Sequence, residues 1–220
     1  MLKISEYMYG NKVYQKKYVK KNDQKLEELA LNGQTPQALF IGCVDSRVLP
    51  NLITDTGPGD MLIVRNVGNF VATLEESLSE TSTASAIEFA VKVLKVKEII
   101  VCGHTQCGAI YTIYSDLDAV TFPHLAQWLD HGEKVKEKVT QMHGTFQSRD
   151  AMLRTAEKVS VSVQLENLLT YPFVREAVEK DRLKLHGWIY DIQTGEISCY
   201  DPVEDTFKRL EDVEAGEVGT

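Results

Sequence analysis

The sequence predicts an α/β protein, a three-layer α/β/α domain with a mostly parallel central sheet and an N-terminal helical arm. Two observations lead to this fold class. Short, continuously apolar segments recur along the chain, as strands buried on both faces require. Longer segments with apolar residues at helical spacing lie between them. This alternation favours parallel strands joined by right-handed crossovers.

The first 32 residues are expected to form the arm. Ile4, Tyr7 and Met8 recur at a spacing of three to four, and a similar pattern resumes at Leu26. Both stretches are typical of amphipathic helices. We therefore expect residues 1–32 to pack on something outside their own core.

Five later segments are expected to be strands. Three are apolar runs, and the last two are joined by Gln193, Thr194 and Gly195, a tight hairpin that adds an antiparallel edge. In order, these strands span residues 38–43, 61–66, 98–103, 183–191 and 196–201. Helices are expected at residues 77–95, from near Cys107 onward, at 121–142 and at 150–169. Together these elements give one α/β domain over residues 33–205, followed by a solvated tail at 206–220.

Composition narrows the range of partners. Of the 220 residues 43% are hydrophobic and 25% are charged, and the net charge is -8. An acidic surface repels phosphate backbones and anionic lipids, so we expect neither nucleic acid nor membrane as a partner. The N-terminus lacks the apolar stretch of a signal peptide. The four cysteines are sparse and irregularly spaced, which favours a reducing, cytoplasmic location.

Three possible metal ligands follow two of the predicted strands. Cys43 ends the first strand, and His104 and Cys107 come just after the third. In open α/β sheets, the carboxyl ends of strands at a topological switch point form the binding crevice. If the first and third strands are neighbours, with the second outside, the three side chains meet there. Two thiolates and one imidazole suit zinc with one tetrahedral position free, although iron or cobalt accepts the same donors.

Asp45 and Arg47 lie beside the first of these ligands. A carboxylate next to a metal-activated water can accept its proton in a hydrogen bond, and a guanidinium can hold that carboxylate ionised and oriented. The alternative is an aspartate that caps a helix and forms a structural salt bridge. Arg65 is open to three interpretations, since it could line a subunit interface, hold the loop of Asp45 or form a structural ion pair.

The motif CVDSRV at 43–48, combined with HTQCG at 104–108, resembles the β-class carbonic anhydrases, which carry C-x-D-x-R and H-x-x-C. The likeness covers roughly residues 30–200 and includes HGWIYDIQTG at 186–195. This resemblance implies a lyase, a zinc-dependent carbonic anhydrase that reversibly hydrates carbon dioxide to bicarbonate and a proton by zinc-bound hydroxide. It also implies a homodimer or homotetramer.

The resemblance assigns roles to individual residues. It makes Cys43, His104 and Cys107 the Zn2+ ligands, and Asp45 and Arg47 the catalytic dyad. Gln34 matches a glutamine that donates to bound substrate, often across a dimer interface. The expected substrate pocket is formed by Gln34, Leu62, Val67, Phe89 and Gly103. Phe89 stands where relatives often carry tyrosine, and Leu62 where plant-like members carry phenylalanine.

Three other functions remain open at this point. A hydrolase of carbonyl sulfide or carbon disulfide would use the same hydroxide attack on the same scaffold. A structural zinc module would need a fourth protein ligand, for which Asp45 is nearest. A thiol redox protein would use Cys102 and Cys107, but their spacing is not that of a C-x-x-C motif.

Overall fold

The computed structural model describes residues 3–79, 81–142 and 146–210. The chain divides into two compact units, Met1–Thr35 and Pro36–Thr220. Among the described residues, no helix combines the length and the apolar character needed to cross a membrane.

The first unit is helical, as expected for residues 1–32. It contains α1 (Ile4–Lys17), a 3-10 turn at Val19–Lys21 and α2 (Asp23–Asn32). Neither of these two helices buries a side chain against the rest of the described chain. The expected packing of this arm on another molecule stays a prediction.

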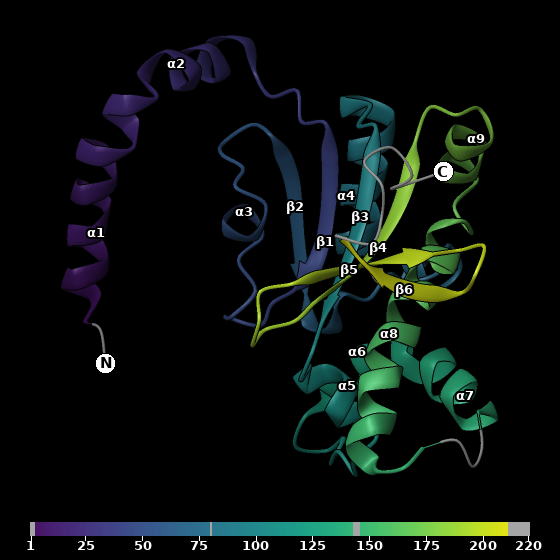
Figure 1. Ribbon diagram of the computed structural model, residues 1–220. Helices are drawn as coiled ribbons and strands as arrows, with labels where there is room; N and C mark the ends of the chain where they lie inside the picture. Colours follow the sequence, from purple (N-terminus) through teal and green to yellow (C-terminus); the bar gives the residue numbers. More distant parts are fainter. Residues whose placement is uncertain (1–2, 80, 143–145, 211–220) are drawn as a thin grey trace. The chain divides into compact units, whose positions relative to one another are not determined.

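The second unit is built on one mixed sheet of six strands, in the order β2-β1-β3-β4-β5-β6 (Figure 1). Its strands are β1 (Ala38–Cys43), β2 (Met61–Asn66), β3 (Glu98–His104), β4 (Lys184–Tyr190), β5 (Ile197–Asp201) and β6 (Thr206–Arg209). The first four pair in parallel, and β5 and β6 add antiparallel pairs. The predicted α/β class, with a mostly parallel sheet and an antiparallel edge, is confirmed.

Strand β6 lies in the segment that the sequence analysis assigned to a tail at 206–220. Its two end residues are exposed and its two central residues are half-buried, and Lys208 forms ion pairs with Asp201 and Glu204. A short edge strand rich in charge lacks the continuous apolar run by which the buried strands were recognised. The assignment of residues 206–209 to a tail was therefore wrong, and residues 211–220 lie outside the described part of the chain.

Helices connect the strands and cover the sheet. They are α3 (Pro50–Ile53), α4 (Thr81–Glu88) continued by a π-helical segment η4 (Phe89–Leu94), α5 (Gly108–Ile113), α6 (Pro123–Leu129), α7 (Glu133–Gln141), α8 (Arg149–Leu168) and α9 (Pro172–Glu179). The predicted helix at 121–142 is divided by a 3-10 turn between α6 and α7. The short helices α3 and α9 were not predicted.

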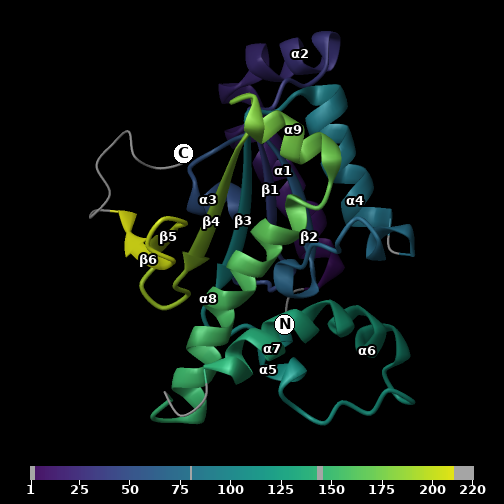
Figure 2. The ribbon, with the colours of Figure 1, turned by 90° about the vertical axis from the view of Figure 1, so that its right-hand side faces the viewer.

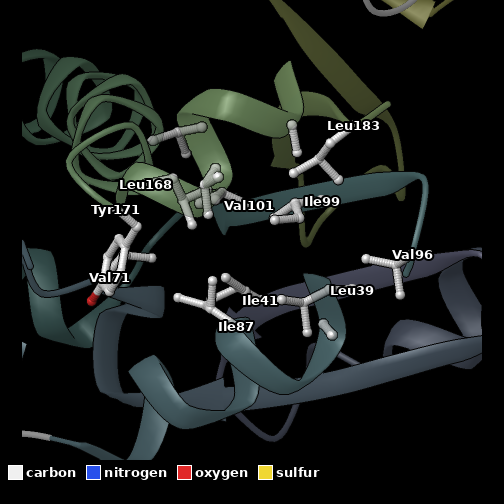
Figure 3. Close-up of a cluster of buried hydrophobic side chains, with 14 of the residues drawn as sticks. Leu39, Ile41, Val71, Ile87, Val96, Ile99, Val101, Leu168, Tyr171 and Leu183 are labelled. Atoms are coloured by element: carbon white, nitrogen blue, oxygen red, sulfur yellow. The ribbon is translucent and has the colours of Figure 1, made fainter. Parts of the chain in front are cut away.

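The main hydrophobic core lies between the sheet and helices α4, α8 and α9, which share one side of it in Figure 2. Because side chains alternate along a strand, Leu39 and Ile41 of β1 face this core beside Ile99 of β3. Figure 3 shows them meeting Ile87 of α4 and residues of the helices beyond. A core filled by strands β1 and β3 fixes the position of their carboxyl ends.

A second cluster lies where those ends meet helices α5 to α8. It contains Phe70, Ile110, Val135 and Val163 together with two cysteines, Cys43 and Cys107. In Figure 1 the strands run toward α5, α6 and α7 at this end of the sheet. The edge of the sheet at which the sequence analysis expected a crevice is therefore covered by helices and carries both thiols.

Candidate metal centre

The three predicted ligands meet at the carboxyl ends of β1 and β3. Cys43 is the last residue of β1, His104 is the last of β3, and Cys107 is the N-cap of α5. Since β1 and β3 are parallel neighbours, these ends lie side by side. The Sγ atoms of both cysteines and a ring nitrogen of His104 all lie within 4.8 Å of one another, and all three residues are buried. Such a cluster has the size and the donor atoms of a metal site.

The imidazole of His104 is oriented for ligation. Its Nδ1 lies 2.9 Å from the carbonyl oxygen of Thr105, which holds a proton on that nitrogen. Its Nε2 is buried and has no hydrogen-bond partner among the described residues. Leaving a buried polar atom unpaired is costly, so an atom in this position calls for an explanation. A metal ion bonded to Nε2 would provide the missing partner. The three residues therefore fit a bound metal ion.

The two thiols share their ionisation. The pKa of Cys43 is lowered to about 4, chiefly by hydrogen bonding to Cys107 and also by the adjacent His104 and the backbone N–H groups near Asp45 and Gly68, which together outweigh burial. The pKa of Cys107 is raised well above its usual range, because its thiol donates to Cys43 and because it is buried. Cys43 therefore loses its proton easily. A bound divalent cation would make loss of the proton of Cys107 favourable as well.

Asp45 and Arg47 form a bidentate pair beside the ligands. Arg47 Nε donates to Asp45 Oδ1 at 2.9 Å, and Nη2 donates to Oδ2 at 2.7 Å. This guanidinium holds the pKa of Asp45 well below its usual range, so the carboxylate is ionised. Asp45 Oδ2 lies 3.9 Å from Nε2 of His104. The helix-cap part of the alternative is wrong, because the N-cap of the next helix, α3, is Leu49. The salt bridge is present, and its catalytic role stays a prediction.

Arg65 supports the same loop from β2. Its Nε donates to the carbonyl oxygen of Cys43 at 2.9 Å, and its Nη2 donates to that of Asp45 at 2.7 Å. These two bonds bear out the interpretation in which Arg65 holds the loop of Asp45, and a position at a subunit interface stays a prediction. Its guanidinium ties the ligand and the carboxylate to the adjacent strand.

Glu157 is a further residue of the centre that the sequence analysis missed. Its Oε1 accepts the backbone N–H of Cys107 at 2.9 Å and pairs with Arg154 Nη2 at 2.9 Å. Burial raises the pKa of Glu157 to about 7, although Cys107 and Arg154 stabilise the charged form. A local signal existed, because Glu157 falls on the apolar side of the predicted helix at 150–169. The contact with Cys107, 50 residues away, left no signal in the sequence.

Removal of the Glu157 side chain is expected to destabilise the fold. In Glu157→Ala, Arg154 and the amide of Cys107 lose a buried partner, and breaking such a pair costs about 3–5 kcal/mol. Glu157→Gln keeps an acceptor oxygen and should lose less than half as much. Urea denaturation measures the free energy of unfolding, with Glu137→Ala, at an exposed position of α7, as a near-neutral control. Equal stability of Glu157→Ala and the parent would contradict this role.

The expected substrate-pocket residues lie in different places. Val67 packs against the cluster that contains Cys43 and Cys107. Gly103 is buried, and a Cβ there would come within 2.8 Å of Val161 Cγ2 on α8, so close packing by itself accounts for this glycine. Gln34 belongs to the N-terminal unit and is exposed.

Among the described residues, Leu62 and Phe89 do not belong to the hydrophobic cluster around the ligands. Leu62 pairs with Leu39, four positions before Cys43 on β1, which corresponds to about 13 Å of strand. It also packs against the main core. Phe89, at the start of η4, is 42% exposed. The roles of these pocket residues toward substrate stay predictions.

The chain is similar to known proteins in both sequence and structure over most of its length. A family model described as carbonic anhydrase matches residues 38–197. A carbonic anhydrase of Pseudomonas aeruginosa is 41% identical over 179 residues, 80% of this chain and 79% of its own length. The solved structure of the β-carbonic anhydrase CcaA aligns with a TM-score of 0.88 at 33% identity, covering 94% of this chain and 98% of that one. A structure described as a tetrameric β-carbonic anhydrase from Sordaria macrospora aligns with a TM-score of 0.78 at 27% identity, covering 98% of each chain.

Proposed function

Because this chain belongs to the β-class carbonic anhydrases, we propose that Cys43, His104 and Cys107 hold a zinc ion and that Asp45 and Arg47 act as its catalytic dyad. The reaction is the reversible hydration of carbon dioxide to bicarbonate and a proton. The chain is thus a metal-dependent carbonate dehydratase.

The observation that carries the metal assignment is the meeting of three donor atoms within 4.8 Å, with Nε2 of His104 buried and otherwise unpaired among the described residues. Two thiolates and one imidazole are a soft donor set, for which zinc is the preferred divalent ion. When bound, the metal supplies a Lewis acid that makes water a nucleophile at neutral pH.

Asp45 orients the nucleophile in this proposal. Its carboxylate is ionised and accepts a hydrogen bond from the attacking water, which directs an oxygen lone pair toward the carbon atom of substrate. Arg47 engages both carboxylate oxygens and thereby keeps Asp45 in this role. This pairing supports an open centre, in which Asp45 is not itself a ligand, and argues against a closed structural zinc module.

The substrate pocket requires a second subunit in our proposal. Val67 lines it from within the chain, because it packs against the ligand cluster. Leu62 is separated from Cys43 by about 13 Å of strand. For Leu62, Phe89 and Gln34 to contact carbon dioxide or bicarbonate, a partner chain would supply them. Gly103 would contribute its backbone only.

We propose accordingly that the enzyme is a homo-oligomer. Apolar side chains flank the dyad in sequence and are exposed in the single chain, among them Val44, Leu49 and Leu52. A neighbouring subunit would cover them. The Sordaria macrospora relative is described as tetrameric, and light scattering would distinguish a dimer from a tetramer here. A cytoplasmic location is proposed on the grounds that the four cysteines are free thiols.

Stopped-flow hydration of carbon dioxide, measured with metal content on one preparation, tests the proposal. We expect about one zinc per chain and an activity that disappears on chelation and returns with added zinc. The relatives are carbonic anhydrases by name and do not favour the alternative, a hydrolase of carbonyl sulfide or carbon disulfide. A protein that is inactive on carbon dioxide but hydrolyses either of those compounds would reverse this preference.

A further inference from the structure

One peptide group beside the metal centre is held at both of its ends. The N–H of Gly68 donates to Sγ of Cys43 at 3.4 Å. The carbonyl oxygen of Val67 accepts a hydrogen bond from Nε1 of Trp128 at 2.7 Å. Both groups belong to the single peptide unit that joins Val67 to Gly68. Since a trans peptide is planar, its C=O and N–H point in opposite directions. The indole therefore holds the carbonyl oxygen of the same peptide whose N–H points at the sulfur of Cys43.

The backbone of this loop does not by itself dictate that orientation. Gly68 has a φ of 80°, and Asn69 follows with a φ of 49°. Glycine adopts this left-handed backbone conformation freely, and asparagine adopts it at some cost. A rotation of the peptide between Val67 and Gly68 would turn the N–H away from Cys43 and bring the carbonyl oxygen toward it. A carbonyl oxygen that faces a thiolate is repelled by its negative charge. The hydrogen bond that holds the carbonyl of Val67 in place therefore changes the electrostatic potential at Cys43.

Trp128 is itself firmly placed. It belongs to α6, 61 residues from Val67 in sequence, and its ring is tilted against Phe70 at 6.4 Å. Its other neighbour is His131, in a T-shaped contact at 5.0 Å. Nδ1 of His131 lies 3.5 Å from Oε2 of Glu76. The donor is thus fixed by packing on two sides, as a positioning residue requires.

We propose that Trp128 is a positioning residue of the metal centre, which acts on the ligand Cys43 through the peptide between Val67 and Gly68. Its hydrogen bond orients this peptide and polarises it, and so strengthens the bond from the amide of Gly68 to the thiolate. Hydrogen bonds to a ligand sulfur reduce the electron density that it gives to the metal. Trp128 therefore makes the bound metal a stronger Lewis acid. This inference rests on the proposed function, in which Cys43 is a ligand.

The chain contains its own control. It has two tryptophans, and Nε1 of the other, Trp188, is buried without a hydrogen-bond partner among the described residues. Trp188 lies on β4 and packs with Phe40. Replacement of either tryptophan by phenylalanine removes the same atoms, but within the described part of the chain only the replacement at position 128 removes a hydrogen bond.

The test uses the cobalt-substituted holoenzyme, whose thiolate-to-cobalt absorption reports on sulfur. In Trp128→Phe, we expect this absorption to shift to longer wavelength and the pH midpoint of kcat to rise by about half a unit, as loss of one modest hydrogen bond would give. Trp188→Phe should match the parent in both. If Trp128→Phe folds poorly, benzothienylalanine, in which sulfur replaces the indole N–H, can be incorporated at position 128 in the Trp188→Phe background. The same two shifts are expected.

Parent values in the residue-128 variants, or equal shifts in Trp128→Phe and Trp188→Phe, would overturn the proposal. Failure of the proposed function has a different signature. If the parent itself shows no thiolate-to-cobalt absorption, the assignment of the cysteines as ligands is wrong, and the role of Trp128 falls with it. A parent that shows the absorption, with no change at position 128, overturns the role of Trp128 alone.

Discussion

Cys107→Ser is expected to yield a protein that is purified with little or no metal and has almost no hydration activity. In the proposed site two sulfurs and one nitrogen share the ion, and a serine hydroxyl does not ionise at neutral pH to replace a thiolate. A zinc site contributes roughly 10–16 kcal/mol of binding free energy. Loss of one of three ligands should remove about a third of it, or roughly 10³-fold in affinity. Emission spectrometry measures the metal, and stopped-flow assays measure the activity.

Cys199→Ser is the matched control for that variant. Cys199 is also buried and free, but it lies on β5, and burial raises the pKa of its thiol. We expect this variant to carry the parent amount of metal. A Cys107→Ser protein with one tightly held zinc per chain would refute the ligand assignment.

Asp45→Asn is expected to keep its metal and to lose most of its catalytic rate. The amide is neutral, so it neither pairs with the charge of Arg47 nor accepts the proton of water as a carboxylate does. Loss of a general base or of an orienting carboxylate typically costs about 10²–10⁴-fold in rate. Stopped-flow assays at saturating carbon dioxide give kcat, with metal content measured on the same sample.

The control for this substitution is Asp116→Asn, at an exposed position after α5. It makes the same chemical change away from the centre and should leave kcat unchanged. Parent kcat in Asp45→Asn would show that the pair formed with Arg47 is structural only.

The sequence predicted the centre because its signals are local. Cys43, His104 and Cys107 each follow an apolar run, and such runs indicate buried parallel strands. The order of the strands then brings their ends together. Glu157 and Trp128 could not be found in this way. Each acts through one hydrogen bond to the backbone of a residue at least 50 positions away, and no periodicity encodes such a contact.

The same reasoning explains where the fold was mispredicted. Strand β6 is too short and too charged to be recognised as part of a buried sheet, and it exists because β5 offers it an edge. Leu62 was expected beside the substrate because the family resemblance implied it. Within one chain, the register of β2 against β1 places it about four residues along the strand from Cys43, so its role toward substrate stays a prediction. Registers and edges depend on the partner strand, which a single segment does not specify.

Helix α8 couples the unfolding of the two hydrophobic clusters. Val161 and Leu168 on this helix belong to the main core, whereas Leu153, Ala156 and Val163 belong to the cluster around the ligands. A continuous helix melts cooperatively, so neither cluster can open without loosening the other. Backbone amides near the metal centre should therefore exchange their hydrogens as slowly as those in the middle of the sheet, and both should be released in a single global transition.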